Sequence, residues 1–92
     1  MRLVRSTSQF RKALKRILKS GRFQRSEIQN IVDKLARGEN LRESYDDHKL
    51  SGDLANYREC RIKPDLLLVY KIENNDLVLV LVNIGSHSDL FE

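Results

Sequence analysis

The chain has 92 residues, of which 40% are hydrophobic and 33% are charged. This composition is typical of one globular domain rather than of a disordered chain. No apolar run approaches the ~20 residues of a transmembrane helix, and the basic N-terminus lacks the apolar segment of a secretory signal. The single cysteine, Cys60, cannot form an intrachain disulfide, and together with His48 and His87 it falls short of a structural zinc site. We therefore expect one cytoplasmic domain over residues 1–92, with no membrane association, no metal and no cofactor.

Basic residues are concentrated in the first quarter of the chain. The other eight of the 17 basic residues, and all 13 acidic residues, lie beyond Arg25. A polarised basic segment attracts the phosphate backbone of a nucleic acid, so we predict a polyanionic partner, RNA above all. A merely solvated basic helix is the alternative, although a solvated face normally mixes both signs of charge. The basic residues of this segment are Arg2, Arg5, Arg11, Lys12, Lys15, Arg16, Lys19, Arg22 and Arg25.

The first half of the chain predicts a short strand and two helices. The strand is expected over residues 1–5, and Ser6 and Gln9 then match a capping box. Gly21 and Gly38 mark the ends of the two helices, and the short link between them predicts an antiparallel helical hairpin. Apolar residues at helical spacing define the buried faces: Phe10, Leu14, Ile17 and Leu18 in the first helix, and Ile28, Ile31, Val32 and Leu35 in the second.

The second half has the pattern of β-strands. A polar loop over residues 39–47 leads to a short extended piece at 49–51 and a turn at 52–56, and residues 85–91 are expected to form a turn and short tail. The predicted fold class is α+β in the order β–α–α–β–β–β, with both helices on one face of an antiparallel sheet and the first strand at its edge. The last three strands are expected over residues 57–62, 66–70 and 77–82, joined by turns at 63–65 and 74–76.

The candidate acid–base residues are the two histidines, both of which lie outside the apolar runs. RNA cleavage without a metal needs a base for the 2′-hydroxyl proton, an acid for the departing 5′-oxygen and cations for the phosphate. His48 and His87 with Lys49, Arg58 and Arg61 would suffice if the fold brings them together. A single surface histidine is otherwise a solvated side chain without a catalytic role.

Strand alternation sorts the residues around Cys60. Glu59 and Arg61 share one face of the strand with Tyr57, and Arg58 shares the other with Cys60. Glu59 and Arg61 could form only a structural ion pair, and Cys60 is expected to be a buried thiol rather than a nucleophile. Phe91 either holds the tail against the core or stacks on a nucleobase.

Four segments together resemble a known family. The chain is similar in order and length to the YafQ branch of the RelE-like toxins, which are the toxin halves of bacterial and archaeal toxin–antitoxin pairs. The resemblance is strongest from residue 47 to residue 91. The segments are residues 47–52 (DHKLSG), 57–60 (YREC), 62–70 (IKPDLLLVY) and 85–91 (GSHSDLF).

The resemblance implies a RelE-like microbial-ribonuclease-type fold and a metal-independent endoribonuclease, an mRNA interferase. Such a toxin enters the ribosomal A site, cuts translated mRNA and is neutralised by a cognate antitoxin. Operator DNA is contacted only through the toxin–antitoxin complex. His48, Asp65, His87 and Phe91 match active-site positions of the family. His87 would be the leading proton-transfer residue and His48 a second; Asp65 would orient or polarise a neighbour, and Phe91 would pack against substrate.

One departure from the family pattern concerns an acid and a histidine two residues apart, where this chain has Glu59 and Arg61. Arginine cannot act as a base at neutral pH but can hold the scissile phosphate. A non-catalytic RNA- or ribosome-binding module therefore stays open, as does a subunit that only represses its own operon with its antitoxin. The predicted catalytic set is His48, Glu59, Arg61, Asp65, His87 and Phe91. The predicted RNA- or ribosome-binding set is Arg11, Lys12, Lys15, Arg16, Lys19, Lys49 and Arg58.

Overall fold

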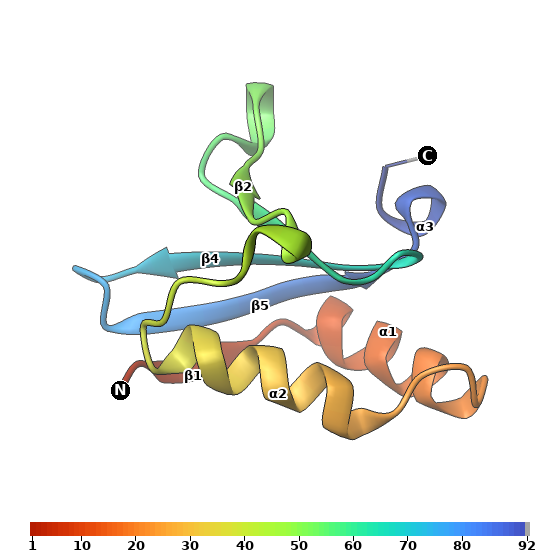
Figure 1. Cartoon of the computed structure of the whole chain (residues 1–92). Coiled ribbons are helices and arrows are strands. Elements are labelled where there is room, and N and C mark those ends of the chain that lie inside the picture. The colour runs from red at the N-terminus through yellow and green to blue at the C-terminus, as the bar shows by residue number, and fades with distance from the viewer. Residues whose placement is uncertain (92) are drawn as a thin grey trace.

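The computed structural model describes residues 1–91 and has a five-stranded sheet with two helices packed against one face (Figure 1). The helices are α1 (Ser8–Lys19) and α2 (Arg25–Ala36), and the α+β class is confirmed. Within residues 1–91, no helix has the length and apolar character needed to cross a bilayer. The strands are β1 (Leu3–Ser6), β2 (His48–Lys49), β3 (Arg58–Lys63), β4 (Leu66–Glu73) and β5 (Val78–Gly85), in the sheet order β1-β5-β4-β3-β2.

The core lies between the two helices and the inner face of the sheet. The predicted apolar positions of α2 are all buried, and Leu66–Tyr70 is buried along its whole length, as expected for a strand covered on both faces. Gly21 and Gly38 follow the two helices in the left-handed conformation, with φ of 75° and 78°. The core residues are Phe10, Ala13, Ile17, Ile28, Ile31, Val32, Leu35, Ala36, Cys60, Ile62, Leu66, Leu68, Tyr70, Leu79, Leu81 and Ile84.

Helix α1 begins one residue later than the predicted capping box at Ser6. Thr7 is the N-cap, and its Oγ1 accepts a hydrogen bond from the Phe10 N–H (3.0 Å). The same hydroxyl donates to the carbonyl oxygen of Val82 (2.7 Å), and the Thr7 N–H donates to that of Leu81 (3.0 Å). Bonds to β5 therefore keep Ser6 in β1 and select Thr7 as the cap.

Three features of the sheet differ from the prediction. The sheet is mixed, because β1 pairs in parallel with β5, whereas β2, β3, β4 and β5 pair antiparallel in succession. A short fifth strand, β2, covers His48–Lys49, one residue earlier than the expected extended piece, and η2 (Gly52–Leu54) occupies the expected turn. The expected turn and tail instead contain α3 (His87–Phe91), which follows β5 directly. The elements β1, β2 and α3 are too short to produce a periodicity in the sequence.

The face of the sheet opposite α1 and α2 carries β2 with its following loop and α3, which both rise from that side (Figure 1). We call it the open face; it is defined by Glu59 and Arg61 of β3 and by Leu67 and Val69 of β4, which alternate with core residues of the same strands. The register of β4 and β5 shifts at Val69, so that Val69 pairs with Asn83 and Tyr70 pairs with Leu81. This bulge gives β5 an extra residue at the middle of the open face.

Candidate active site on the open face of the sheet

A groove of about 250 Å³ crosses the open face between the β2–β3 connection and α3. Phe91, for which the family resemblance implies packing against substrate, lies along its α3 side. Apolar side chains form most of the groove's lining, and Gln9, Tyr57 and Asn83 add polar atoms. This combination suits a nucleobase, which has apolar faces and a polar edge. The lining residues are Gln9, Leu50, Leu54, Tyr57, Val69, Val82, Asn83, Leu90 and Phe91.

His48 lies in β2 directly opposite Glu59 of β3. Its Nε2 is 3.7 Å from Glu59 Oε1, and its Nδ1 is 2.6 Å from the carbonyl oxygen of Asp46. A carbonyl oxygen only accepts hydrogen bonds, so Nδ1 carries the proton and the neutral ring has its lone pair on Nε2. The Glu59 side chain is only 12% exposed, so its carboxylate can stabilise the imidazolium that forms when Nε2 takes a proton.

Behind His48, a polar cluster fixes the backbone of the preceding residue. Asp47 Oδ1 accepts hydrogen bonds from the Tyr70 hydroxyl and from Arg58 Nε, the latter at 3.3 Å. Burial, followed by the hydrogen bond to Asp47, raises the pKa of Tyr70, so the hydroxyl remains a donor at all physiological pH values. Arg58 was predicted to bind RNA; its guanidinium contacts Asp47 and Tyr70, on the face of β3 that also carries Cys60.

Helix α3 carries the second histidine. His87 is exposed at its first position, and the rings of His87 and Phe91 are 5.2 Å apart between centroids. The Ser86 N–H donates to Asp89 Oδ2 (3.0 Å), while the Asp89 N–H donates to Ser86 Oγ (3.1 Å). This reciprocal cap satisfies two N–H groups at the start of a helix that has only five residues.

The cap of α3 should depend on pH. The hydrogen bonds from Ser86, with Arg16 nearby, hold the pKa of Asp89 below its ordinary value. A carboxyl with a lowered folded pKa contributes stability above its unfolded pKa and loses it as the pH falls through the folded value. We expect α3 to fray as the pH drops below about 4, and NMR amide shifts of Ser86 should follow the transition. Asp89→Asn should abolish that pH dependence, and identical Ser86 shifts at about pH 3 and about pH 7 in the natural chain would contradict it.

The remaining predicted catalytic residues lie near the same end of the sheet. Asp65 is in the β3–β4 turn and forms an ion pair with Arg22, a cation of the α1–α2 link. Arg61 is exposed on the open face; it pairs with Leu67, which pairs with Gly85. Two strand spacings separate the backbones of Arg61 and Gly85, about 10 Å, which an arginine side chain can largely span toward α3.

Cys60 is fully buried in the core, as expected. Burial raises the pKa of its thiol to about 12, with a smaller contribution from the negative charges of Asp47 and Glu59. The thiolate is the nucleophilic form of cysteine, so the Cys60 side chain has a structural role.

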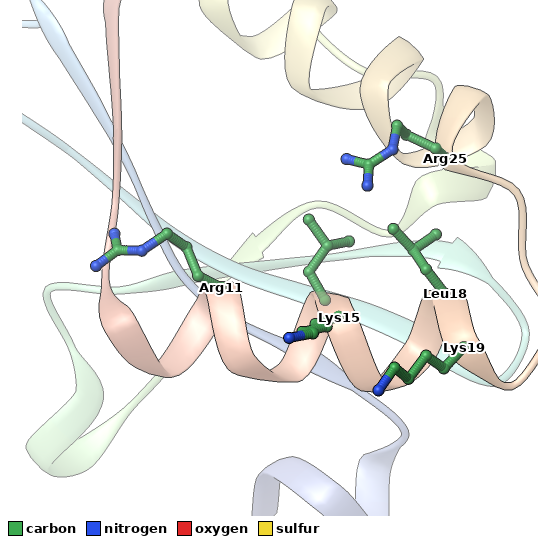
Figure 2. A pocket seen from close by; sticks show the side chains of 6 residues that line it. Arg11, Lys15, Leu18, Lys19 and Arg25 are labelled. Atoms are coloured by element: carbon green, nitrogen blue, oxygen red, sulfur yellow. The ribbon is translucent and has the colours of Figure 1, made fainter.

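The basic residues of the first quarter divide into groups with different surroundings. Arg2 joins two backbone segments, since its Nη1 donates to the Leu35 carbonyl (2.7 Å) and its Nε to that of Asp76 (3.0 Å). The basic residues of α1 line two different hollows. Lys12 and Arg16 line a hollow with Asn83, Ile84 and Asp89, next to α3. Arg11, Lys15 and Lys19 line a different groove on the side toward α2, together with Leu14, Leu18 and Arg25 (Figure 2).

A model of the family described as "Bacterial toxin of type II toxin-antitoxin system, YafQ" matches residues 2–92. The chain belongs to this YafQ family. A metal-bound toxin from Helicobacter pylori is 43% identical, with a TM-score of 0.88, and the match covers 99% of this chain and 100% of that one. In the Escherichia coli DinJ–YafQ complex, a chain 26% identical has a TM-score of 0.87, with both chains covered completely. The mRNA interferase toxin YafQ of Escherichia coli (strain K12) is 38% identical over 47 residues, which are 51% of this chain and 49% of that relative, about half its length.

Family membership confirms the resemblance seen in the sequence, and the YafQ structures confirm the fold class. Several residues that line the groove in this YafQ-family toxin were missed, among them Leu54, Val69 and Asn83. Leu50 and Tyr57 stand inside the family-like segments and could have been found there; Asn83 depends on the bulge in β5. Among residues 1–91, no three His, Cys, Asp or Glu side chains gather in a group that could hold a metal.

Proposed function

We propose that this toxin is a ribosome-dependent, metal-independent mRNA endoribonuclease that inhibits translation. The observation that carries the proposal is the groove on the open face, which Phe91 lines; the ring of His87 contacts Phe91, and His48 pairs with Glu59 in adjacent strands of the same sheet. The relative in Escherichia coli strain K12 is named an mRNA interferase, which supports the same activity.

The proposed chemistry assigns one proton transfer to each histidine. His48 Nε2, unprotonated in the neutral ring, takes the proton of the 2′-hydroxyl, whose oxygen attacks the adjacent phosphorus. The bond from phosphorus to the 5′-oxygen breaks, and protonated His87 gives its proton to that oxygen, leaving a 2′,3′-cyclic phosphate and a 5′-hydroxyl. Arg61 holds the phosphate, Phe91 packs against a base, and Asp65 keeps Arg22 in position.

The surroundings of the groove suit a ribosomal substrate in the cytoplasm. Lys12 and Arg16 line a hollow beside α3, and Lys49 is exposed in β2, so cations are available for phosphate contacts on two elements. Phosphate contacts of this kind supply affinity without sequence preference, while the mRNA in the A site supplies the scissile bond. A cognate antitoxin neutralises the toxin, as the DinJ–YafQ complex of the relative suggests, and operator DNA is contacted only by that complex.

The test is cleavage of a defined mRNA by purified toxin, on translating ribosomes and on the same RNA alone. We expect cuts only on the ribosome. Because a similar Helicobacter pylori toxin is metal-bound, the toxin should be dialysed against a chelator, checked by metal analysis and assayed again. Equal cleavage by the stripped toxin is expected; activity that returns only with added transition metal would overturn metal independence, and efficient cutting of free RNA would overturn ribosome dependence.

A non-catalytic ribosome-binding module is the second candidate, and it is favoured by Arg61 where the family often has a histidine. Ribosome binding without any cut at high toxin concentration would support it. Operator binding with the antitoxin, without cleavage or growth arrest, would instead indicate a subunit that only represses its operon.

A further inference from the structure

The carbonyl group that selects the tautomer of His48 belongs to a residue in an uncommon backbone conformation. Asp46 has a φ of 48°, in the left-handed region that residues with a side chain seldom adopt. Its carbonyl oxygen lies 2.6 Å from His48 Nδ1. A left-handed residue other than glycine costs free energy and persists only where its surroundings hold it. The contacts that hold Asp46 therefore determine which nitrogen of His48 keeps the lone pair.

Asp46 is held from both sides along the chain. On the N-terminal side, its N–H donates to the carbonyl oxygen of Glu43 (2.9 Å) and ends the short 3₁₀ helix η1 (Glu43–Tyr45). On the C-terminal side, its carbonyl belongs to the same planar peptide group as the Asp47 N–H, so the orientation of residue 47 fixes the direction of the carbonyl. Residue 47 is in turn anchored through its own side chain.

The anchor of Asp47 within the core is the hydroxyl of Tyr70. Tyr70 is only 1% exposed and packs among apolar side chains, where a phenylalanine would fill the same space. Its hydroxyl donates to Asp47 Oδ1, and its strand, β4, lies between β5 and β3 in the sheet. Arg58 Nε donates to the same oxygen at 3.3 Å, but the Arg58 side chain is 35% exposed. The rigid part of the anchor is therefore Tyr70.

The strand that carries His48 is too short to position the ring by itself. β2 has two residues, and its ladder to β3 pairs them only with Glu59 and Arg58. Such a ladder places the backbone of His48 but leaves its side-chain torsions free. The Asp46 carbonyl at Nδ1 directs the ring, and Nε2 then lies on the side of Glu59, 3.7 Å from Oε1.

We propose that Tyr70 is a positioning residue for His48. The Tyr70 hydroxyl holds Asp47, and the peptide group that Asp47 shares with Asp46 holds the Asp46 carbonyl. That carbonyl keeps the proton of the neutral His48 ring on Nδ1, which leaves Nε2 free to accept a proton. Tyr70 acts through two other residues and lies in the core. The inference rests on the proposed function only in the role of His48 as the base.

The first test measures the tautomer of His48 in the full-length toxin from the nitrogen NMR shifts of its imidazole ring. Tyr70→Phe removes only the hydroxyl, and Tyr45→Phe is the matched control, because Tyr45 also packs against the core but lies outside the contacts of Asp47. We expect the neutral His48 ring to be protonated on Nδ1 in the natural toxin and in Tyr45→Phe, and to change toward the form protonated on Nε2 in Tyr70→Phe. His87 is an internal control, since it lies on α3 and its ring shifts should stay constant.

The second test measures mRNA cleavage on translating ribosomes. Tyr70→Phe should lower the single-turnover rate constant at saturating ribosomes by about 10- to 100-fold, while the half-saturating concentration changes by less than about 2-fold. Asp47→Asn keeps an oxygen that accepts from Tyr70 and should retain the natural tautomer and most of the rate. Asp47→Ala removes the acceptor and should behave like Tyr70→Phe. Thermal unfolding of each variant separates a lost fold from a misplaced ring.

An unchanged His48 tautomer in folded Tyr70→Phe would overturn the proposal, even if cleavage became slower. Equal damage by Asp47→Asn and Asp47→Ala would also overturn it, because the charge of Asp47 rather than its contact with Tyr70 would then matter. The tautomer measurement needs no RNA, so it decides the positioning of His48 even in a toxin that cuts no mRNA, a result that would contradict the proposed function. A changed tautomer with undiminished cleavage would support the positioning contact and overturn the role of His48 as the base.

Discussion

Replacing His87 with alanine should lower the rate of mRNA cleavage on translating ribosomes by about 10²–10⁴-fold, the usual contribution of a general acid or base. His87 is exposed at the start of α3, and its ring contacts Phe91, so the substitution removes a titrating group without opening the core. Thermal unfolding should therefore hardly change. Single-turnover cleavage measures the first effect, and growth after expression without antitoxin gives the cellular result.

The matched control for His87 is His48→Ala, which removes the other proposed proton carrier. Each variant alone should abolish growth arrest, and the double variant should be little worse than either, since the two histidines act in one step. If the natural toxin and His87→Ala arrest growth equally, the role given to His87 is wrong. Loss of folding in His87→Ala would also be inconsistent with its exposure.

Replacing Gly85 with alanine should reduce cleavage by about 100-fold although Gly85 has no side chain of its own. A methyl group at Gly85 would lie 2.8 Å from Asp89 Cβ and 3.0 Å from Asp89 Oδ2, so α3 must move. His87 and Phe91 move with it, and a displacement of about 1 Å can cost a factor of about 100 in rate. The sheet and the helical core should keep their NMR spectrum, while the amides of Ser86 and Asp89 shift.

Asp89 provides the control for this effect. Gly85→Ala/Asp89→Gly removes the Cβ that clashes and should recover part of the activity relative to Asp89→Gly alone, whereas Gly85→Ala/Asp89→Asn keeps the Cβ and should not. A double-mutant cycle therefore reports a coupling between positions 85 and 89. Full activity of Gly85→Ala would show that α3 need not hold its position against β5.

The long elements could be predicted from the sequence because each has its own periodicity. The apolar spacing of α1 and α2 and the continuous apolar run of β4 identify helix and buried strand without reference to the rest of the chain. The parallel pairing of β1 is different, since β1 meets β5 only after the chain has passed through both helices and the meander. The start of α1 at Thr7 depends on the same pairing, through bonds to Leu81 and Val82.

The candidate site was predicted in part. His48, His87 and Phe91 stand in family-like segments, and the open face has Phe91 in its groove and the two histidines on elements at either side of it. The pairing of His48 with Glu59 depends on a strand of two residues, which has no detectable period. The Tyr70–Asp47 hydrogen bond joins residues 23 positions apart and is visible only in the folded chain. Arg58 belongs to that cluster and therefore has different surroundings from the basic residues of α1.

Cys60 makes the toxin a reporter of its own unfolding. The thiol is inaccessible in the folded state and is the chain's only cysteine. A thiol-labelling reagent therefore modifies each molecule once, at a rate set by how often the core of β3 opens. Quenched labelling followed by mass spectrometry would measure this opening without a fluorophore or a tag. A partner that binds only the folded toxin would slow the labelling of Cys60. The decrease in the labelling rate would then give the free energy of binding.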